Sequence, residues 1–230
     1  MLKRRILFVI SSVDRIEETG QPTGAWLEEL AAPYYTFVDA GHDPIIASIK
    51  GGSAAIDPLS LQAPWLTPFG QRFNVDEVAR RRLLQTVALA SISANEVDVV
   101  YAVGGVAAAW DFPDCKDLAR IVTEVNARGN CVAGVCHGVL GLTGAASATG
   151  RPLVEGRAVT GVSNAEEVLT GFDKIVPVMP ENRLLELGGR YSCAAPLERH
   201  VVRDGNLMTG QNPASAGPLA EAILQSWRSQ

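Results

Sequence analysis

Long apolar runs are missing from this chain of 230 residues. A membrane-spanning helix needs about 18 consecutive apolar residues or more, and no stretch comes near that length. The basic segment 3–5 is followed by only one short apolar run, Ile6–Ile10, before the sequence turns polar, and such a run is too short for a secretory signal peptide. We therefore expect a cytoplasmic protein without a membrane partner.

Paired cysteines, spaced histidines and basic clusters are also missing. The four cysteines include no CxxC pair, so we expect reduced thiols and no disulfide framework. No two histidines stand four residues apart, the spacing with which a helix presents two metal ligands, so we predict no metal site. A net charge of −5 without a basic cluster argues against nucleic acid as the main partner.

The apolar segments that are present alternate between strand length and helix length. Continuous apolar runs predict buried strands, and a three- to four-residue apolar step predicts helices. The expected strands cover residues 6–10, 44–49, 97–103 and 131–135, and the expected helices cover 24–40, 75–90, 114–128, 138–148 and 214–227. This alternation predicts an α/β fold, with a parallel sheet covered on both faces, built as a single domain over residues 1–230.

Proline marks two further features. Pro33 lies inside the first expected helix, where we predict a kink or a short break. Residues 51–70 contain three prolines and three glycines. They predict a long loop or an excursion, and long loops in compact domains are often functional.

The stretch Gly134-Val135-Cys136-His137-Gly138 lies between an expected strand and an expected helix. A G-x-nucleophile-x-G turn forms a sharp elbow that holds the central side chain in a strained pose. A helix N-terminus behind Cys136 would lower the pKa of its thiol. The backbone N–H groups of His137 and Gly105 would form an oxyanion hole, with Gly104-Gly105 ending the neighbouring strand.

A simpler interpretation of the same residues stays open. Free cysteines are commonly buried and inert, and Cys136 could be a structural residue in a glycine-rich turn. His137 can act as a general base only if the turn directs both side chains to one side. His42 and His200 are interpreted as structural.

Several longer stretches match the pattern of one protein family. They are TGAWLEELAAPYYTFVDAGH (23–42), ASIKGG (47–52), DPLS (57–60), GG…WDFPD (104–114), VCHG (135–138), LVEGRAVTGVSNAEE (153–167) and DGNLMTGQNPAS (204–215). Through them the chain resembles the ThiJ/PfpI superfamily, also called the class I glutamine amidotransferase-like fold, in its branch of heat-shock glyoxalases and chaperones. The resemblance implies a flavodoxin-like three-layer sandwich with a mostly parallel sheet and a nucleophile elbow.

The resemblance also implies roles for single residues. Cys136 matches the nucleophile, His137 its neighbour in a Cys-His-acid triad, and Glu29 a glutamate that leans over the thiol. The acid of the triad falls in SNAEE, where the match favours Glu167 over Glu166. From the residues alone, this stretch is a helix start with Asn164 as its cap.

One stretch departs from the branch. The branch usually has P-G-G-H-G at the oxyanion strand, whereas this chain has Val103-Gly104-Gly105-Val106-Ala107. The pocket should therefore be less polar, and Ala107 replaces a glycine whose backbone freedom could be needed. We expect Gly104, Val106 and Trp110 to line the pocket, although Trp110 fits the core equally well.

The resemblance implies a cofactor-independent glyoxalase that converts methylglyoxal, a small-molecule aldehyde, to lactate without glutathione or metal. Three alternatives remain open at this stage: a cysteine-dependent amidase, peptidase or deglycase; a stress chaperone or cysteine redox sensor; and a hydratase of another small electrophile. Relatives usually form homodimers, so a homodimer is expected here.

Overall fold

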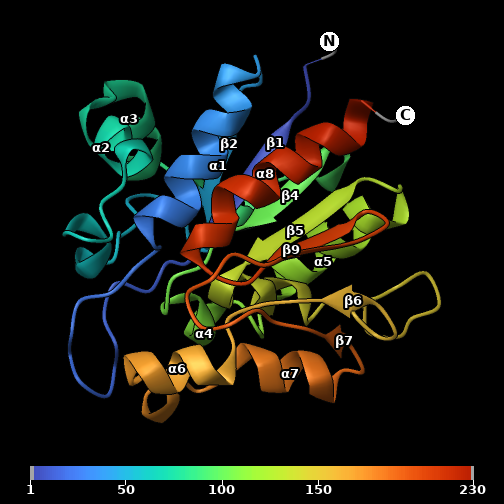
Figure 1. The fold of residues 1–230 in the computed structure, drawn as a ribbon. Helices are drawn as coiled ribbons and strands as arrows, with labels where there is room; N and C mark the ends of the chain where they lie inside the picture. The colour runs from blue at the N-terminus through green and yellow to red at the C-terminus, as the bar shows by residue number, and fades with distance from the viewer. Residues whose placement is uncertain (1–2, 229–230) are drawn as a thin grey trace.

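A computed structural model describes residues 3–228 of the chain. Within these residues, one sheet has the strand order β3-β2-β1-β4-β5-β9-β8 (Figure 1). All neighbouring strands are parallel except β8 and β9, which are antiparallel. The strands are β1 (Ile6–Ile10), β2 (Ile45–Ser48), β3 (Val87–Ala88), β4 (Val99–Ala102), β5 (Cys131–Val135), β8 (Val201–Asp204) and β9 (Leu207–Gly210).

The alternation of side chains along β1 shows how the layers arise. Successive residues of a strand point to opposite faces of the sheet, and every residue of β1 is buried. Phe8 packs in an apolar cluster with α1 (Leu27–Asp39) and α8 (Pro213–Arg228), whereas Leu7 and Val9 pack in a second cluster with α5 (Lys116–Ala127). The fold is therefore the expected three-layer α/β sandwich, with α1 and α8 on one face and α5 on the other (Figure 1).

Three predicted helices differ from the observed ones. Helix α1 continues through Pro33 without the predicted break. The segment 75–90 contains α3 (Glu77–Leu84), which begins where the Asp76 carboxylate accepts two backbone N–H groups, and then strand β3. In place of a helix over 138–148 the chain forms a 3₁₀ segment, Cys136–Leu142. The three glycines within residues 138–148 disfavour an α-helix.

Of the two predictions for the segment 51–70, the structure shows the excursion. It contains a 3₁₀ turn, Pro58–Leu61, and its end starts α2 (Pro68–Val75). Each of these two elements has a proline in its first turn, a position that proline favours. Each is also capped by a side-chain oxygen, of Asp57 or of Thr67, that accepts a backbone N–H. The segment therefore packs beside the start of α1 as a structured excursion.

The sequence predicts little more than a helix start between residues 149 and 199. In the structure, α6 (Asn164–Thr170) and α7 (Pro180–Glu186) lie together along one end of the main sheet (Figure 1). A two-stranded sheet of β6 (Ala158–Val159) and β7 (Arg190–Tyr191) accompanies them. These elements are too short for hydrophobic periodicity to reveal.

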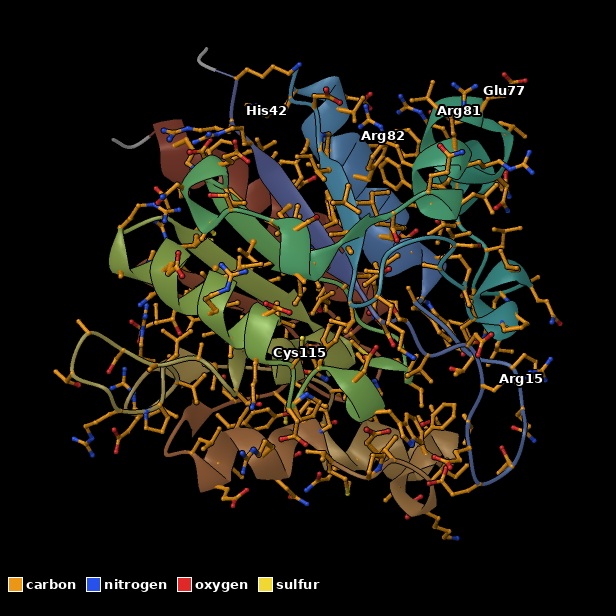
Figure 2. The ribbon with its side chains drawn as sticks, turned by 180° about the vertical axis from the view of Figure 1, so that it is seen from behind. Arg15, His42, Glu77, Arg81, Arg82 and Cys115 are labelled. Atoms are coloured by element: carbon orange, nitrogen blue, oxygen red, sulfur yellow. The ribbon has the colours of Figure 1, made fainter. Side chains whose placement is uncertain are left out.

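The remaining short elements connect the layers. They are α4 (Ala108–Asp111) and the 3₁₀ turns Leu89–Ser91, Ala94–Glu96 and Phe172–Lys174. Arg82 of α3 binds Asp43, which precedes β2, at 2.6 Å, and Figure 2 shows Arg82 on the side of α3 that faces α1. None of the helices within residues 3–228 is long and apolar enough to span a membrane.

Candidate active site

Cys136 follows the last residue of β5 and has a left-handed backbone, with φ of +56°. This conformation is rare for a residue other than glycine and is stored strain of the kind found at functional sites. The flanking glycine is required by close packing, because a Cβ atom on Gly138 would lie 2.3 Å from the carbonyl oxygen of Ala102 in β4. The chain thus forms the predicted elbow at the carboxyl end of a central strand.

His137 connects the thiol to a carboxyl group on α6. Its Nδ1 lies 3.4 Å from Cys136 Sγ, and its Nε2 lies 2.8 Å from Glu167 Oε1. All three side chains are buried. The elbow therefore directs Cys136 and His137 to the same side, which is the condition set for His137 as a base.

Glu29 approaches the same thiol from α1. Its carboxyl group is buried, and a Cβ atom on Gly104 would lie 2.2 Å from Glu29 Oε2, so only glycine leaves space for the carboxyl. Burial raises the pKa of Glu29 well above its usual value, although interactions with Cys136 and the Gly104 N–H oppose the shift. Burial thus favours the protonated form of Glu29, whose hydroxyl can donate a proton.

Glu28, the neighbour of Glu29, faces elsewhere. Consecutive helix positions are about 100° apart, and the Glu28 carboxyl accepts a hydrogen bond from Thr67 at the start of α2. Glu28 is only partly buried. Of the LEEL pair, the second glutamate is the one at the thiol.

The predicted lowering of the Cys136 thiol pKa is wrong in direction. Burial, followed by the negative potential of Glu29 and Glu167, raises the pKa of Cys136 well above that of a free cysteine, and the backbone N–H of His137 offsets only part of this. The segment after Cys136 is a short 3₁₀ helix, so the expected α-helix dipole is missing. The thiol is consequently neutral and needs a base to be deprotonated.

The strand end Gly104-Gly105 forms the other side of the elbow. Gly105 has φ of +107°, and a Cβ atom there would lie 2.4 Å from the Gly24 carbonyl oxygen. Gly105 lines the pocket beside Cys136, whereas Gly104 lies behind Glu29 and is not in the lining. Ala107 has φ of −50°, an ordinary helical value, so the concern that this position needs glycine is wrong.

Glu166 is buried next to Glu167 but has a different set of contacts. Its carboxylate accepts hydrogen bonds from backbone N–H groups of Ser163 and Leu197 and from the side chains of Gln211 and Asn212. Ser163, and not Asn164, caps α6 in a capping box with Glu166, so the predicted cap was one residue late. Glu166 thus connects three segments at the rim of the pocket through hydrogen bonds, a role that the sequence did not predict.

These side chains converge on a pocket of about 240 Å³. Trp26 and Trp65 line it, with ring centroids 5.6 Å apart and nearly perpendicular planes. Val106 lines it as expected, but Trp110 does not, because Trp110 packs against the α5 cluster. No periodic pattern in the sequence points to Trp65, which comes from the 51–70 excursion.

The other histidines and cysteines lie away from the pocket. His42 accepts the backbone N–H of Arg4 and packs against Trp227, and Figure 2 shows it at the end of the molecule that carries the chain termini. Cys115 lies at the start of α5 (Figure 2). Within residues 3–228, no cluster of three or more His, Cys, Asp or Glu side chains could hold a metal ion.

Fold and site together define an α/β protein with a buried cysteine on a strained elbow at the carboxyl edge of a parallel sheet. The model of the DJ-1/PfpI family matches residues 23–226, and the chain belongs to this family.

Relatives with known names cover nearly the whole chain. The glutathione-independent glyoxalase HSP31 of Saccharomyces cerevisiae is 30% identical over 227 residues, covering 94% of each chain. Glyoxalase 3 of Candida albicans is 26% identical, covering 97% of this chain and 98% of the relative.

Solved structures agree with this assignment. The Rapid Encystment Protein 24 KDa of Francisella tularensis has a TM-score of 0.92 at 32% identity, covering 97% of this chain and 98% of that one. Glyoxalase III from Candida albicans has a TM-score of 0.88 at 26% identity, covering 97% of each chain.

Proposed function

We propose that the chain is a cofactor-independent glyoxalase, which converts methylglyoxal and water to lactate without glutathione. The observation that carries the proposal is the convergence of Cys136, Glu29 and His137 in one small, buried pocket. Relatives named as glutathione-independent glyoxalases, at 26–30% identity, support it.

The first step is attack of Cys136 sulfur on the aldehyde carbon. His137 takes the thiol proton, because its Nδ1 lies 3.4 Å from the sulfur, and Glu167 stabilises the resulting imidazolium from the other ring nitrogen. Glu29, whose protonated form is favoured by burial, gives its proton to the aldehyde oxygen. The product is a hemithioacetal with a new S–C bond.

The second step moves hydrogen from C1 to C2. The Glu29 carboxylate now removes the C1 proton while the His137 imidazolium protonates the C2 oxygen, which forms an enediol and returns His137 to its neutral form. Glu29 then gives its proton to C2 and takes the proton of the C1 hydroxyl. C1 is oxidised to a thioester and C2 is reduced to an alcohol, so no external oxidant or reductant is needed. The N–H groups of Gly105 and His137 stabilise the developing oxyanion.

Water then hydrolyses the thioester. His137 acts as the base toward water, lactate leaves, and the thiol regains its proton. Overall one methylglyoxal and one water give one lactate.

A pocket of about 240 Å³, lying below the usual range of about 300–1,000 Å³ for drug-sized ligands, disfavours peptide substrates and hence the peptidase alternative.

The test is lactate formation from methylglyoxal without glutathione, comparing the parent chain with Cys136→Ala. Cys193→Ala is the matched control, because Cys193 is an exposed free thiol outside the pocket lining. We expect Cys136→Ala to lower kcat by at least about 1,000-fold and Cys193→Ala to match the parent. Full turnover by Cys136→Ala would contradict the proposal.

The homodimer, the cytoplasmic location and a chaperone activity stay predictions.

A further inference from the structure

We propose that the pocket selects 2-oxoaldehydes whose substituent is neutral, apolar and larger than methyl, an aryl group above all, and that Leu197 is a specificity-determining residue. The inference rests on the proposed function, because it concerns the same site. It is carried by the walls of the pocket, which the reaction steps above do not use.

Most of the wall residues other than the reacting groups are apolar. Trp26, Trp65, Val106, Phe172, Leu197 and Pro213 contribute to them. Val106, which stands where the resemblance predicts a histidine, is buried at the end of the oxyanion strand. A methyl group would leave most of these surfaces without a contact, whereas a flat ring could pack against the edge-to-face pair of indoles.

Two polar side chains on the walls, Asn212 and Thr170, already have hydrogen-bond partners within the protein. The Asn212 amide donates to Glu166 and to the Glu198 carbonyl and accepts from Ser215. The Thr170 hydroxyl donates to the Glu166 carbonyl. Neither side chain has a donor left for a hydroxyl or amide on the substituent, because its hydrogen bonds are made within the protein. The Trp26 indole N–H, by contrast, is buried without a partner and remains available as a hydrogen-bond donor to the substrate.

Charge excludes an anionic substituent. The lining contributed by the described residues contains Glu29, Glu166 and Glu167 but no lysine or arginine. A phosphate or carboxylate on the substrate would meet no countercharge there, and desolvating it without a partner is costly. The preferred substituent is thus uncharged.

Leu197 occupies the rim in an unusual conformation. It lines the pocket, its side chain is 45% exposed, and its backbone has φ of +67°. Its N–H donates to buried Glu166 Oε1 at 2.9 Å, which fixes the strained turn. Strain that holds an exposed apolar side chain at a pocket rim indicates a binding role, since an unstrained polar residue would serve a simple surface turn.

The aldehyde end of any substrate must reach Cys136 on the floor of the pocket. The substituent then extends toward the walls and the rim that carries Leu197. An aryl group would bury apolar surface against this rim, and a methyl group is too short to do so. The difference in burial predicts a preference expressed in kcat/KM.

The experiment compares phenylglyoxal with methylglyoxal as probes, measuring mandelate and lactate as products. Initial rates are used because both aldehydes also modify arginine side chains, and Cys136→Ala gives the background. We expect kcat/KM for phenylglyoxal to exceed that for methylglyoxal by about tenfold or more.

Leu197→Gly tests the residue itself. Glycine accepts a positive φ without strain and keeps the N–H that binds Glu166. We expect the ratio of kcat/KM for phenylglyoxal over methylglyoxal to fall about tenfold. Leu169→Ala is the control, because Leu169 is an exposed leucine on α6 outside the lining, and it should leave the ratio unchanged. Thermal unfolding of each variant checks that it is folded.

The outcomes separate the inference from the function. A methylglyoxal kcat/KM equal to or above that of phenylglyoxal would overturn the inference and leave the glyoxalase in place. A ratio unaffected by Leu197→Gly in a folded variant would overturn the role of Leu197. Turnover of neither aldehyde would overturn the proposed function and this inference with it.

Discussion

The floor of the pocket, formed by the reacting groups Cys136, His137, Glu29 and Glu167, differs from the walls in how completely its carboxyl groups are hydrogen-bonded. On the floor, both oxygens of Glu29 and both of Glu167 are buried without a well-aligned hydrogen bond, while the Glu167 carboxylate stands at ion-pair distance from His137. On the walls, Glu166 accepts hydrogen bonds from four residues. Two neighbouring glutamates of α6 thus have different roles: Glu167 belongs to the reacting groups, whereas Glu166 is structural.

Catalysis and substrate selection therefore reside in different parts of the pocket. Buried polar groups that lack full partners cost stability, and a protein retains them where a substrate or a transferred proton completes the set. Satisfied groups and apolar surfaces cannot take part in proton transfer. Floor variants should thus alter rate for every substrate, and wall variants should alter the choice among substrates.

The largest effect is expected at Glu29. In Glu29→Gln the side chain keeps its size but cannot carry the proton between C1 and C2, so kcat should fall about 1,000-fold. Glu28→Gln is the matched control, because Glu28 binds Thr67 away from the thiol. Steady-state lactate formation measures both. Equal activity of the two variants would remove Glu29 from the mechanism.

The adjacent pair on α6 gives the next largest effect. Glu167→Gln removes the charge that stabilises the His137 imidazolium, and we expect kcat to fall about 100-fold with a changed pH–rate profile and little loss of stability. Glu166→Gln turns an amide N–H₂ toward groups that donate, and should cost about 2 kcal/mol of unfolding free energy.

Urea unfolding and pH–rate profiles of the two variants distinguish these roles. If Glu166→Gln shifted the pH–rate profile and Glu167→Gln only lowered stability, the assignment of floor and wall on α6 would be reversed.

The smallest effect on turnover is expected at Asp111, the last residue of α4. Its carboxyl accepts the Ser12 N–H at 2.7 Å, its Oδ1 is buried without a partner, and burial raises its pKa to about 6. Between the unfolded pKa near 4 and this value the folded chain binds more protons, so its stability falls as pH rises.

Asp111→Asn should remove this decline while leaving kcat/KM for both aldehydes near that of the parent. Urea unfolding across about pH 4 to 7 should show that the parent loses about 2 kcal/mol more than the variant. Parallel curves for the two proteins would show that Asp111 titrates normally.

Much of this arrangement is predictable because strong, local signals encode it. The continuous apolar runs of β1, β4 and β5 indicate buried parallel strands, and the resemblance identifies Cys136, His137 and Glu29. The choice of Glu167 over Glu166 agrees with the observed contacts, although its role stays a prediction.

The rest depends on contacts between distant segments. Trp65 and Leu197 reach the pocket from an irregular excursion and a strained turn, which no periodic pattern reveals. The direction of the Cys136 pKa shift depends on how deeply the elbow is buried and on carboxyls from α1 and α6, which spacing in the sequence does not report.

The most direct test of this account is kcat/KM for methylglyoxal and phenylglyoxal in Glu29→Gln and Leu197→Gly. We expect Glu29→Gln to lower both values by a similar factor, so that their ratio stays near that of the parent. Leu197→Gly should lower the ratio about tenfold. A Glu29→Gln variant that changed the ratio as much as Leu197→Gly does would contradict the separation of floor and walls.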